Sequence, residues 1–443
     1  MIAPARSIAF EILLHVTDTD TNSHSDELLR DPQVNALSQQ DRALATTMVL
    51  GTLRWQLQLD ARIRPLLARP DTKLSPGAET ALRLGAFQLL HLDRIPPHAA
   101  IGESVELTRR AGEHFATGLV NAVLRKLAKS PRVDAAPASL AAEYAHPAWL
   151  AESWIRNYGE PAARAICAFD QQPAPVTIRL VHPEAEASLV EAGIELAPGS
   201  FLAAARRVVG GDVARTQAFR NGWIRIQDEG SQLVAELAGQ GSRILDTCAA
   251  PGGKTAILAE RSPEADITAA DINRRRLDAM RRNLTALGDR IHFVTQDAAS
   301  MTLAPEHDLI LCDVPCSGTG TIARNPEIRL RLAADDLTRH SERQRRILAA
   351  ALGGLAPGGR LIYSTCSLEP EENEQVVEAV LAARPGFTCV PVSAELAALA
   401  VSGRVHEEGS AKLAAHALRD GYLRTLPGIL DCDGFFAAIL TQS

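Results

Sequence analysis

Two cysteines of this chain stand in short polar motifs of the kind found in loops, Asp313-Val-Pro-Cys316 and Thr365-Cys366-Ser367. Upstream of both lies a glycine-rich turn, Cys248-Ala-Ala-Pro-Gly-Gly-Lys254. A thiolate is a strong nucleophile, and a glycine turn lets a nucleotide-like ligand approach the backbone closely. The three motifs together predict methyl transfer to carbon 5 of a cytosine, a reaction that needs a transient bond from sulfur. Both thiols are candidate nucleophiles.

Carbon 5 of cytosine is too weak a nucleophile to be methylated unaided. A thiolate that adds to carbon 6 converts the ring into an enamine whose carbon 5 can attack a methyl sulfonium, and loss of the carbon 5 proton then expels the sulfur. We expect Asp313, held at the edge of the base, to donate to or orient N3. Lys254 and a nearby helix N-terminus are expected to favour thiolate over thiol. Because a thiol cannot reach a base inside a duplex, the substrate is expected to be single-stranded, looped or flipped out.

The glycine turn also predicts the cofactor. It follows a strand that ends at Asp246-Thr-Cys248, where a doubly wound fold brings backbone amides close to a ligand. Its spacing matches neither the dinucleotide motif nor the phosphate loop, so S-adenosylmethionine is favoured over a pyrophosphate ligand. Asp271 and Asp297 each end a later strand and are expected on the ribose and near the adenine, respectively. A turn without a ligand and carboxylates that only cap helices are the alternatives.

The remaining cysteines have a simpler interpretation. The chain has seven cysteines and no Cys-x-x-Cys pair, so reduced thiols are expected and no metal site is predicted. Small buried hydrophobic side chains are expected at Cys167, Cys312, Cys389 and Cys432. For Cys316 and Cys366 a redox pair is the rival interpretation.

The elements around these motifs fall into three predicted segments. Apolar residues recur with a helical period up to about residue 130, and an all-α bundle is predicted for residues 1–135. Helix starts are indicated by Ser75 before Pro76 and by Pro97, which opens a run to Arg110. A linker rich in Ala and Pro is expected from Ser130 to Ser139. Residues 140–225 mix a helical piece with extended runs and predict a small α+β insert.

From residue 226 to the end, strand-like and helical runs alternate. The predicted strands are Arg243–Cys248, Asp266–Asp271, Ile291–Asp297, Asp308–Asp313 and Gly359–Thr365. Such alternation predicts a parallel, doubly wound, Rossmann-like sheet of the α/β class. In a methyltransferase-type sheet the fourth and fifth of these strands run side by side, so both candidate thiols would face the crevice at their carboxyl ends.

Bulk properties limit the classes of protein that are possible. With 443 residues and 46% hydrophobic residues, the chain has the composition of a soluble protein of two or three domains. No apolar run approaches the roughly 18 residues of a membrane span, and the N-terminus has no signal-peptide core, so no membrane contact and a cytoplasmic location are expected.

The net charge of −7 argues mildly against a nucleic-acid substrate. Arginine clusters at 274–282 and 339–346 could still line a groove, although solvated helix faces are the simpler interpretation.

The motifs resemble those of the RNA 5-methylcytosine methyltransferases. The resemblance is carried by Asp246-Thr-Cys-Ala-Ala-Pro-Gly-Gly-Lys254, Asp313-Val-Pro-Cys-Ser-Gly-Thr-Gly320 and Tyr363-Ser-Thr-Cys-Ser-Leu368. The helical N-terminus, with Gly51-Thr-Leu-Arg54-Trp55 and Asn121-Ala-Val-Leu-Arg125, is similar to the NusB-like domain of the bacterial RsmB (Sun, Fmu) branch. The resemblance spans nearly the whole chain.

That resemblance implies methylation of a cytosine in 16S ribosomal RNA by a monomer. It implies Cys366 as the nucleophile, Cys316 as the thiol that assists release, and RNA contacts from the NusB-like bundle and the insert. By motif matching, the positions on the cofactor side are Cys248, Ala249, Ala250, Pro251, Gly252, Gly253, Lys254, Asp271, Asp297 and Asp313.

Two rival functions use the same sequence differently. A methyltransferase that acts on N or O atoms of a protein or small molecule would need neither thiol. An RNA-binding assembly or antitermination module with a vestigial sheet domain would need neither the thiols nor the intact Gly252-Gly253 turn. The presence of all these residues favours the enzyme.

Overall fold

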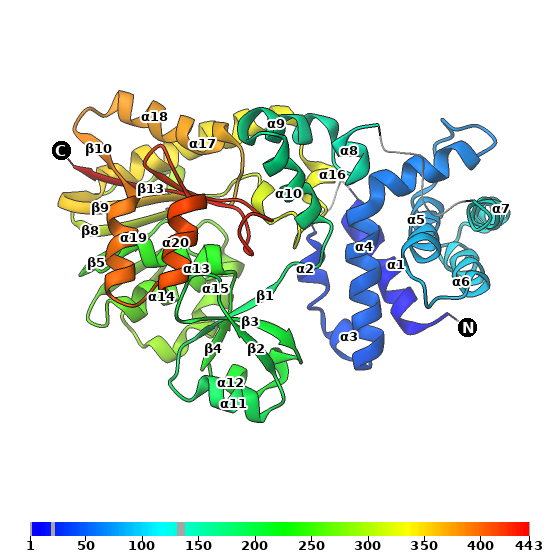
Figure 1. Cartoon of the computed structure of the whole chain (residues 1–443), viewed down its shortest axis with the longest axis horizontal. Helices are drawn as coiled ribbons and strands as arrows, with labels where there is room; N and C mark the ends of the chain where they lie inside the picture. The colour runs from blue at the N-terminus through cyan, green and yellow to red at the C-terminus, as the bar shows by residue number, and fades with distance from the viewer. Residues whose placement is uncertain (1, 19–22, 131–137, 443) are drawn as a thin grey trace. The chain divides into compact units, whose positions relative to one another are not determined.

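The computed structural model describes residues 2–18, 23–130 and 138–442, and Figure 1 shows its elements. The chain forms two compact units: Met1–Pro173 with Ile322–Arg331, and Ala174–Thr321 with Leu332–Ser443. The packing therefore groups the chain differently from the three predicted segments, because residues 140–173 and a short later segment pack with the N-terminal helices. Most of the predicted linker, residues 131–137, lies outside the described residues.

The first unit is helical, as predicted. Its α-helices are α1 (Pro4–Thr17), α2 (Ser25–Leu28), α3 (Pro32–Asn35), α4 (Gln39–Ile63), α5 (Pro76–His91), α6 (Pro97–Arg110), α7 (Thr117–Leu127), α8 (Leu140–Glu143), α9 (Ala148–Tyr158), α10 (Glu160–Asp170) and α16 (Ile328–Arg331). Two 3₁₀ turns, η1 (Arg64–Leu66) and η2 (His114–Ala116), complete it. Apolar side chains of α1, α4 and α5 fill one core, and those of α4 to α7 fill a second.

Helix α5 starts at Pro76, where the Ser75-Pro76 signal predicts it. The Ser75 hydroxyl does not cap the helix and instead donates to Glu113 Oε2 at 2.5 Å. The Glu113 carboxylate accepts from the backbone N–H groups of Gly77 and Ala78 at 2.9 and 2.7 Å. A carboxylate is favoured at a helix N-terminus because it offsets the positive end of the helix dipole. The capping oxygen thus comes from a residue that is remote in sequence.

The second unit contains a small antiparallel sheet, as predicted for the insert. Its strand order is β2-β3-β1-β4. The strands are β1 (Val176–Leu180), β2 (Glu195–Pro198), β3 (Ala205–Gly210) and β4 (Ile224–Ile226), and they are accompanied by α11 (Ala185–Glu191), η3 (Val213–Arg215) and α12 (Gln217–Arg220).

The main sheet of the second unit is mixed and mostly parallel, with the order β11-β12-β13-β9-β8-β5-β6-β7, and β10 pairs with β13. Its parallel strands are β5 (Arg243–Asp246), β6 (Asp266–Asp271), β7 (Ile291–Thr295), β8 (His307–Asp313) and β9 (Leu355–Thr365). The antiparallel ones are β10 (Phe387–Val390), β11 (Leu418–Arg419), β12 (Tyr422–Thr425) and β13 (Phe435–Gln442). The doubly wound parallel part was predicted; the antiparallel part is a finding of the structure.

The helices of this unit connect the strands. They are α13 (Glu229–Ala238), α14 (Gly253–Arg261), α15 (Arg274–Asn283), α17 (Ala334–Gly353), α18 (Glu374–Ala383), α19 (Val392–Val401) and α20 (Glu407–His416), with turns η4 (Thr285–Leu287), η5 (Ala298–Ser300), η6 (Thr319–Thr321) and η7 (Pro370–Glu372). Successive strand residues enter two different cores: Ile244 and Leu311 pack in one, Leu245 and Cys312 in the other. This is the two-residue period of a strand covered on both faces.

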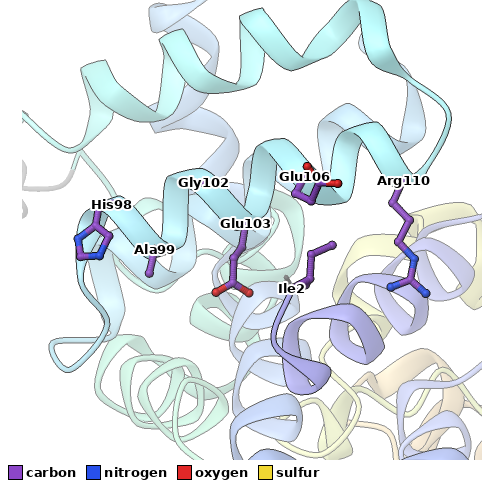
Figure 2. Close-up of a pocket in the computed structure, with 7 residues that line it drawn as sticks. All are labelled: Ile2, His98, Ala99, Gly102, Glu103, Glu106 and Arg110. Atoms are coloured by element: carbon purple, nitrogen blue, oxygen red, sulfur yellow. The ribbon is translucent and has the colours of Figure 1, made fainter.

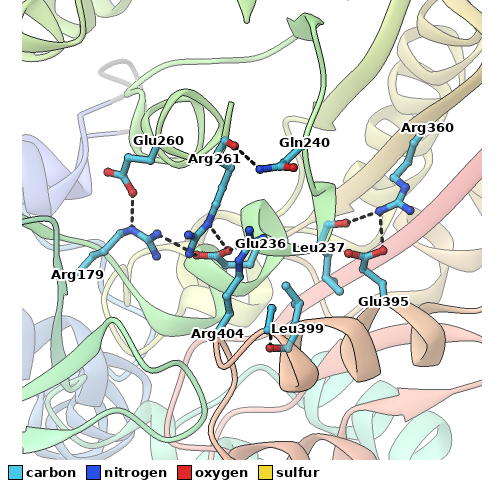
Figure 3. A network of polar contacts seen from close by, with 11 residues as sticks. Arg179, Glu236, Leu237, Gln240, Glu260, Arg261, Arg360, Glu395, Leu399 and Arg404 are labelled. Atoms are coloured by element: carbon cyan, nitrogen blue, oxygen red, sulfur yellow. Dashed lines mark hydrogen bonds and ion pairs between the residues drawn. The ribbon is translucent and has the colours of Figure 1, made fainter. Parts of the chain in front are cut away.

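A buried ion-pair network fastens the insert to the main sheet's helices (Figure 3). Arg179 of β1 donates to Glu236 of α13 and to Glu260 of α14, each at 2.9 Å. Arg261 of α14 makes a forked contact with the same Glu236 at 2.7 and 2.5 Å. Paired, hydrogen-bonded charges of this kind fix a geometry, since leaving any one of them alone in the interior is costly. The network therefore sets where the insert stands relative to α14.

Candidate active site

The two predicted thiols meet at the carboxyl end of the main sheet. Strands β8 and β9 are parallel neighbours, as predicted, and Asp313 is in register with Ser364 at the last pair of this ladder. Because both strands end at the same edge of the sheet, the loops that follow them bring Cys316 and Cys366 close together. The Sγ atoms of Cys316 and Cys366 lie 3.4 Å apart, and both side chains are free thiols.

The two cysteines differ in their surroundings. The pKa of the Cys316 thiol is raised well above its ordinary value, first by its hydrogen bond with Cys366 and then by desolvation. Cys316 therefore keeps its proton at neutral pH. Either sulfur could be the donor in the contact between the two thiols.

Lys254 and Asp313 form an ion pair beside the thiols. Lys254 Nζ donates to Asp313 Oδ2 at 2.7 Å, and the Ser364 hydroxyl donates to Asp313 Oδ1 at the same distance. Burial opposes the charge of Lys254, but the negative charges of Asp313 and of a Cys366 thiolate outweigh it, so its pKa is raised. The ammonium also lies over the ring of Phe435, 5.0 Å from the centroid.

The glycine turn lines a cavity of about 140 Å³ at the start of α14. The residues around it are Ile226, Gln227, Ser231, Asp246, Cys248, Ala249, Ala250, Pro251, Gly252, Gly253, Lys254 and Asp313. Gly252 has a φ of +103°, in the left-handed region that favours glycine, and a side chain there would also strike Met280. The predicted turn thus combines a left-handed backbone position that requires glycine with a cavity suited to part of a ligand.

Asp246, which sequence reasoning used only to mark a strand end, is a polar group of this cavity. Its Oδ2 accepts from the Thr255 hydroxyl at 2.6 Å, while its Oδ1 is buried without a partner among the described residues. Burial raises the pKa of Asp246 to about 7, in spite of the Thr255 hydrogen bond. A buried, half-satisfied carboxyl is costly unless a ligand completes it. Its place directly before the Thr-Cys of the turn is the signal that could have identified it.

The other two predicted cofactor carboxylates make contacts within the chain. Asp271 accepts from the backbone N–H groups of Ala250 and Asn273, at 3.1 and 2.7 Å. It therefore braces the glycine turn. Asp297 accepts from Arg343 Nη2 at 2.9 Å and caps η5. Neither residue lines the cavity at the glycine turn, so their roles on ribose and adenine remain predictions.

The cysteines outside the pair have the predicted character in part. Cys167, Cys312 and Cys432 are buried, while Cys389 is half-buried. Burial raises the pKa of Cys312 to about 12. These four are poorly suited to nucleophilic chemistry because a thiol, unlike a thiolate, is a weak nucleophile.

Other hollows offer less chemistry. A cavity of about 540 Å³ runs along α6 in the helical unit (Figure 2) and is lined by Ile2, His98, Ala99, Gly102, Glu103, Glu106 and Arg110. Its Glu103 already pairs with Arg6 at 2.8 Å, and it contains no thiol. Over residues 2–18, 23–130 and 138–442, no cluster of three or more His, Cys, Asp or Glu is arranged to hold a metal ion. In the same ranges no helix combines the length and apolarity needed to cross a membrane.

Two family models match this chain, one in its C-terminal half and one in its N-terminal part. Residues 236–441 match the model of the family described as 16S rRNA methyltransferase RsmB/F, and residues 3–129 match the NusB family. The first match contains the glycine turn and both thiols, and the second covers most of the helical unit.

Individual relatives give the same result over longer stretches. The chain is 34% identical to the probable ribosomal RNA small subunit methyltransferase B of Bacillus subtilis (strain 168), over 97% of each chain. It is also 34% identical to the ribosomal RNA small subunit methyltransferase B of Pseudomonas putida, over 88% of this chain and 91% of the relative. Among solved structures, the crystal structure of PH0851 has the same fold, with a TM-score of 0.81 and 24% identity over 100% of this chain and 99% of that one.

Proposed function

We propose that this chain, which belongs to the RsmB/F family of 16S rRNA methyltransferases, methylates carbon 5 of one cytosine through a covalent bond from Cys366. The observation that carries the proposal is the 3.4 Å distance between two free thiols beside the Lys254–Asp313 pair. Methylation of an N or O atom gives no use for such a pair, whereas a carbon 5 reaction needs one sulfur to add and a second group to help release it.

The cofactor proposed for the glycine turn is S-adenosylmethionine, and the residues present fit it. The cavity is lined by Asp246, which ends β5 and whose Oδ1 is buried without a partner among the described residues, and by Gly252 and Gly253 at the start of α14. These groups, with Cys248 to Lys254, would hold the cofactor. When bound, S-adenosylmethionine supplies an electrophilic methyl group; the remaining chemistry belongs to the side chains.

The side chains divide the reaction as follows. Lys254 stabilises the thiolate of Cys366, whose Sγ bonds to carbon 6 and moves an electron pair onto carbon 5. Asp313, held by Lys254 and Ser364, orients the N3 edge of the base by accepting from the exocyclic amino group, because N3 itself carries no hydrogen. After carbon 5 has gained its methyl group, its proton passes to Cys316, whose own proton goes to the departing Sγ of Cys366; the electron pair of the C–H bond reforms the ring double bond, and the carbon–sulfur bond breaks. Cys316, in contact with Cys366, assists this release.

The test separates the two thiols. Cys366→Ala removes the only proposed bond to the base, so we expect no methyl transfer to 16S rRNA. Cys316→Ala still allows the bond to form but slows its cleavage, so a protein–RNA adduct that survives denaturing electrophoresis should accumulate. Cys389→Ala, a half-buried cysteine outside the pair, is the control and should behave like the wild type. Normal methylation by Cys366→Ala would contradict the assignment of the nucleophile.

The substrate is proposed to present its cytosine outside a duplex, because the thiols cannot enter a base stack. Bisulfite sequencing of 16S rRNA from cells that lack the chain would identify the nucleotide. A monomer located in the cytoplasm remains our expectation from the sequence, and size-exclusion chromatography with light scattering tests the first part.

A further inference from the structure

Each thiol of the pair is followed directly by a serine. The Oγ atoms of Ser317 and Ser367 lie 3.1 Å apart, close to the 3.4 Å that separates the Sγ atoms of Cys316 and Cys366. Two Cys-Ser dipeptides from different loops thus run side by side. The serines are buried, whereas the cysteines are only partly so. What fixes the serines consequently fixes the spacing of the thiols.

One carboxylate, that of Glu372, holds both serines. Its Oε1 accepts from the backbone N–H of Ser317 at 2.8 Å, and its Oε2 accepts from the Ser367 hydroxyl at 2.5 Å and from the Ser317 hydroxyl. Glu372 is fully buried at the end of η7. Charge-assisted hydrogen bonds to a buried carboxylate are among the strongest in proteins. Glu372 therefore ties the loop after β8 to the loop after β9.

The carboxylate is itself held in place. Gln344 of α17 donates from Nε2 to Glu372 Oε1 at 2.9 Å and to the carbonyl of Pro315, which precedes Cys316, at 3.0 Å. The Tyr363 hydroxyl of β9 donates to the backbone carbonyl of Glu372 at 2.6 Å. A carboxylate fixed from several elements can hold its partners within the small tolerance that catalysis requires.

We propose that Glu372 is a positioning residue of the reaction, which sets the distance and the division of labour between Cys316 and Cys366 without touching the base or the cofactor. The proposal rests on the proposed covalent chemistry of the two thiols. It assigns a function to the acidic run Glu369–Glu374, which composition alone marks only as a source of negative charge.

The charge of Glu372 also acts on the thiols. The ionisable groups that face Cys316 are Cys366, Glu372 and Tyr363. The pKa of Tyr363 is raised well above its ordinary value by burial, so this group is neutral. Hydrogen bonding to Cys366 and burial raise the pKa of Cys316, and the negative charge of Glu372 raises it further. Without that charge, Cys316 would give up its proton at lower pH.

The experiment compares Glu372→Gln with Glu371→Gln in the full-length protein. Glutamine keeps the size of the side chain but removes the charge and one acceptor oxygen. Glu371 is the matched control because it lies on the same turn and makes none of the contacts to the serines described above. For Glu372→Gln we expect single-turnover methyl transfer to fall by about 100-fold, the loss typical of a small misplacement of reacting groups. S-adenosylmethionine affinity by isothermal titration should be unchanged, and so should turnover of Glu371→Gln.

A second measurement does not depend on methyl transfer. Alkylation of each thiol by iodoacetamide, followed by peptide mass spectrometry over a pH series, reports when each sulfur ionises. In Glu372→Gln the alkylation profile of Cys316 should move to lower pH. Unchanged alkylation profiles together with unchanged turnover would overturn the proposal. A shifted alkylation profile with normal turnover would retain Glu372 as the organiser of the thiols but refute their part in the reaction, and hence the proposed function.

Discussion

Lys254 is the residue on which two negative charges of the site converge. It pairs with Asp313 at 2.7 Å, and its pKa is raised because Asp313 and a Cys366 thiolate outweigh the cost of burial. By reciprocity, a cation that is stabilised by a thiolate also stabilises that thiolate. Lys254 thus links Asp313, which is proposed to orient the base, with Cys366, the proposed nucleophile.

Replacement of Lys254 by methionine should show this link in the pH dependence of the rate. The thiolate of Cys366 would form without its neighbouring cation, so the rise of activity with pH should move to higher pH. At neutral pH we expect a loss of about 10²-fold, as for removal of one preorganised electrostatic group. The measurement is the single-turnover rate over a pH series. Lys412→Met, which removes an exposed lysine paired with Glu408, is the control; an unshifted profile for Lys254→Met would contradict the electrostatic role.

At this scale, sequence motifs can predict residues whose chemistry is local. Cys316, Cys366, Lys254 and Asp313 stand in short motifs at strand ends, and the fold brings them together. Glu372 is different, because its function depends on the register of β8 against β9, which places Ser317 and Ser367 around one buried oxygen. No short motif encodes a contact of that kind.

At the scale of the elements, ion pairs join β1, α13 and α14. Glu236 takes hydrogen bonds from Arg179 and Arg261 and is almost fully buried. Burial alone would raise its pKa, but the two guanidinium groups outweigh it, and the pKa is lowered. A carboxyl whose pKa is lower in the folded state than in the unfolded state stabilises the protein at pH values above the unfolded-state pKa. This contribution to stability is lost as the pH falls through the folded-state pKa.

Glu236→Gln should therefore destabilise the second unit at neutral pH. The buried Arg179 and the half-buried Arg261 would lose their shared anion, and removal of one partner from a buried pair costs about 3 to 5 kcal/mol. Urea denaturation at pH 7 measures this loss. Below pH 4.5, the ordinary pKa of the carboxyl, the gap between wild type and variant should narrow. The control is Glu395→Gln, whose partner Arg360 is partly exposed and which should cost at most about 1 kcal/mol. Equal losses for both variants would contradict the network's role.

Secondary-structure elements were predicted best where one pattern decides them. Strand β6 and helix α6 have the predicted bounds, because a short apolar run and a proline at the helix start are local signals. Strand β13 was not predicted. Its sequence, Phe-Phe-Ala-Ala-Ile-Leu-Thr-Gln, lacks the polar alternation of a half-exposed strand because it is buried between β9 and its other neighbours. A continuous apolar run is compatible with a buried helix as well as a buried strand.

On the scale of the whole molecule, the chain passes between its two compact units twice near the active site. Residues up to Thr321 belong to the second unit, Ile322–Arg331 pack in the helical unit, and Leu332 returns. The loop that carries Cys316 thus continues directly into a segment anchored elsewhere. Within the helical unit, Glu327 accepts from the N–H and hydroxyl of Ser25 at 2.9 and 2.8 Å.

Arg329 is a second deeply buried charge of this segment. Its guanidinium donates to the carbonyls of Ala145 and Asp170 at 3.4 and 3.3 Å, and more distantly to those of Arg54 and Tyr144. Burial lowers its pKa to about 10, so it remains charged at neutral pH, and burial raises the pKa of the neighbouring Asp170 to about 7. The anchor is therefore a cation satisfied mainly by backbone carbonyls.

Substitution of Arg329 should slow methyl transfer although Arg329 is not part of the active site. Arg329→Met keeps an unbranched apolar stem but removes the guanidinium, which leaves several buried carbonyls without this donor and should destabilise the helical unit by about 2 to 3 kcal/mol. Because the freed segment continues the Cys316 loop, we expect faster hydrogen exchange in residues 322–331 and slower methyl transfer, with S-adenosylmethionine affinity unchanged. Arg164→Met, which breaks an exposed pair with Glu143, should alter neither. If exchange rises in the segment and methyl transfer stays normal, the anchoring of residues 322–331 has no part in catalysis.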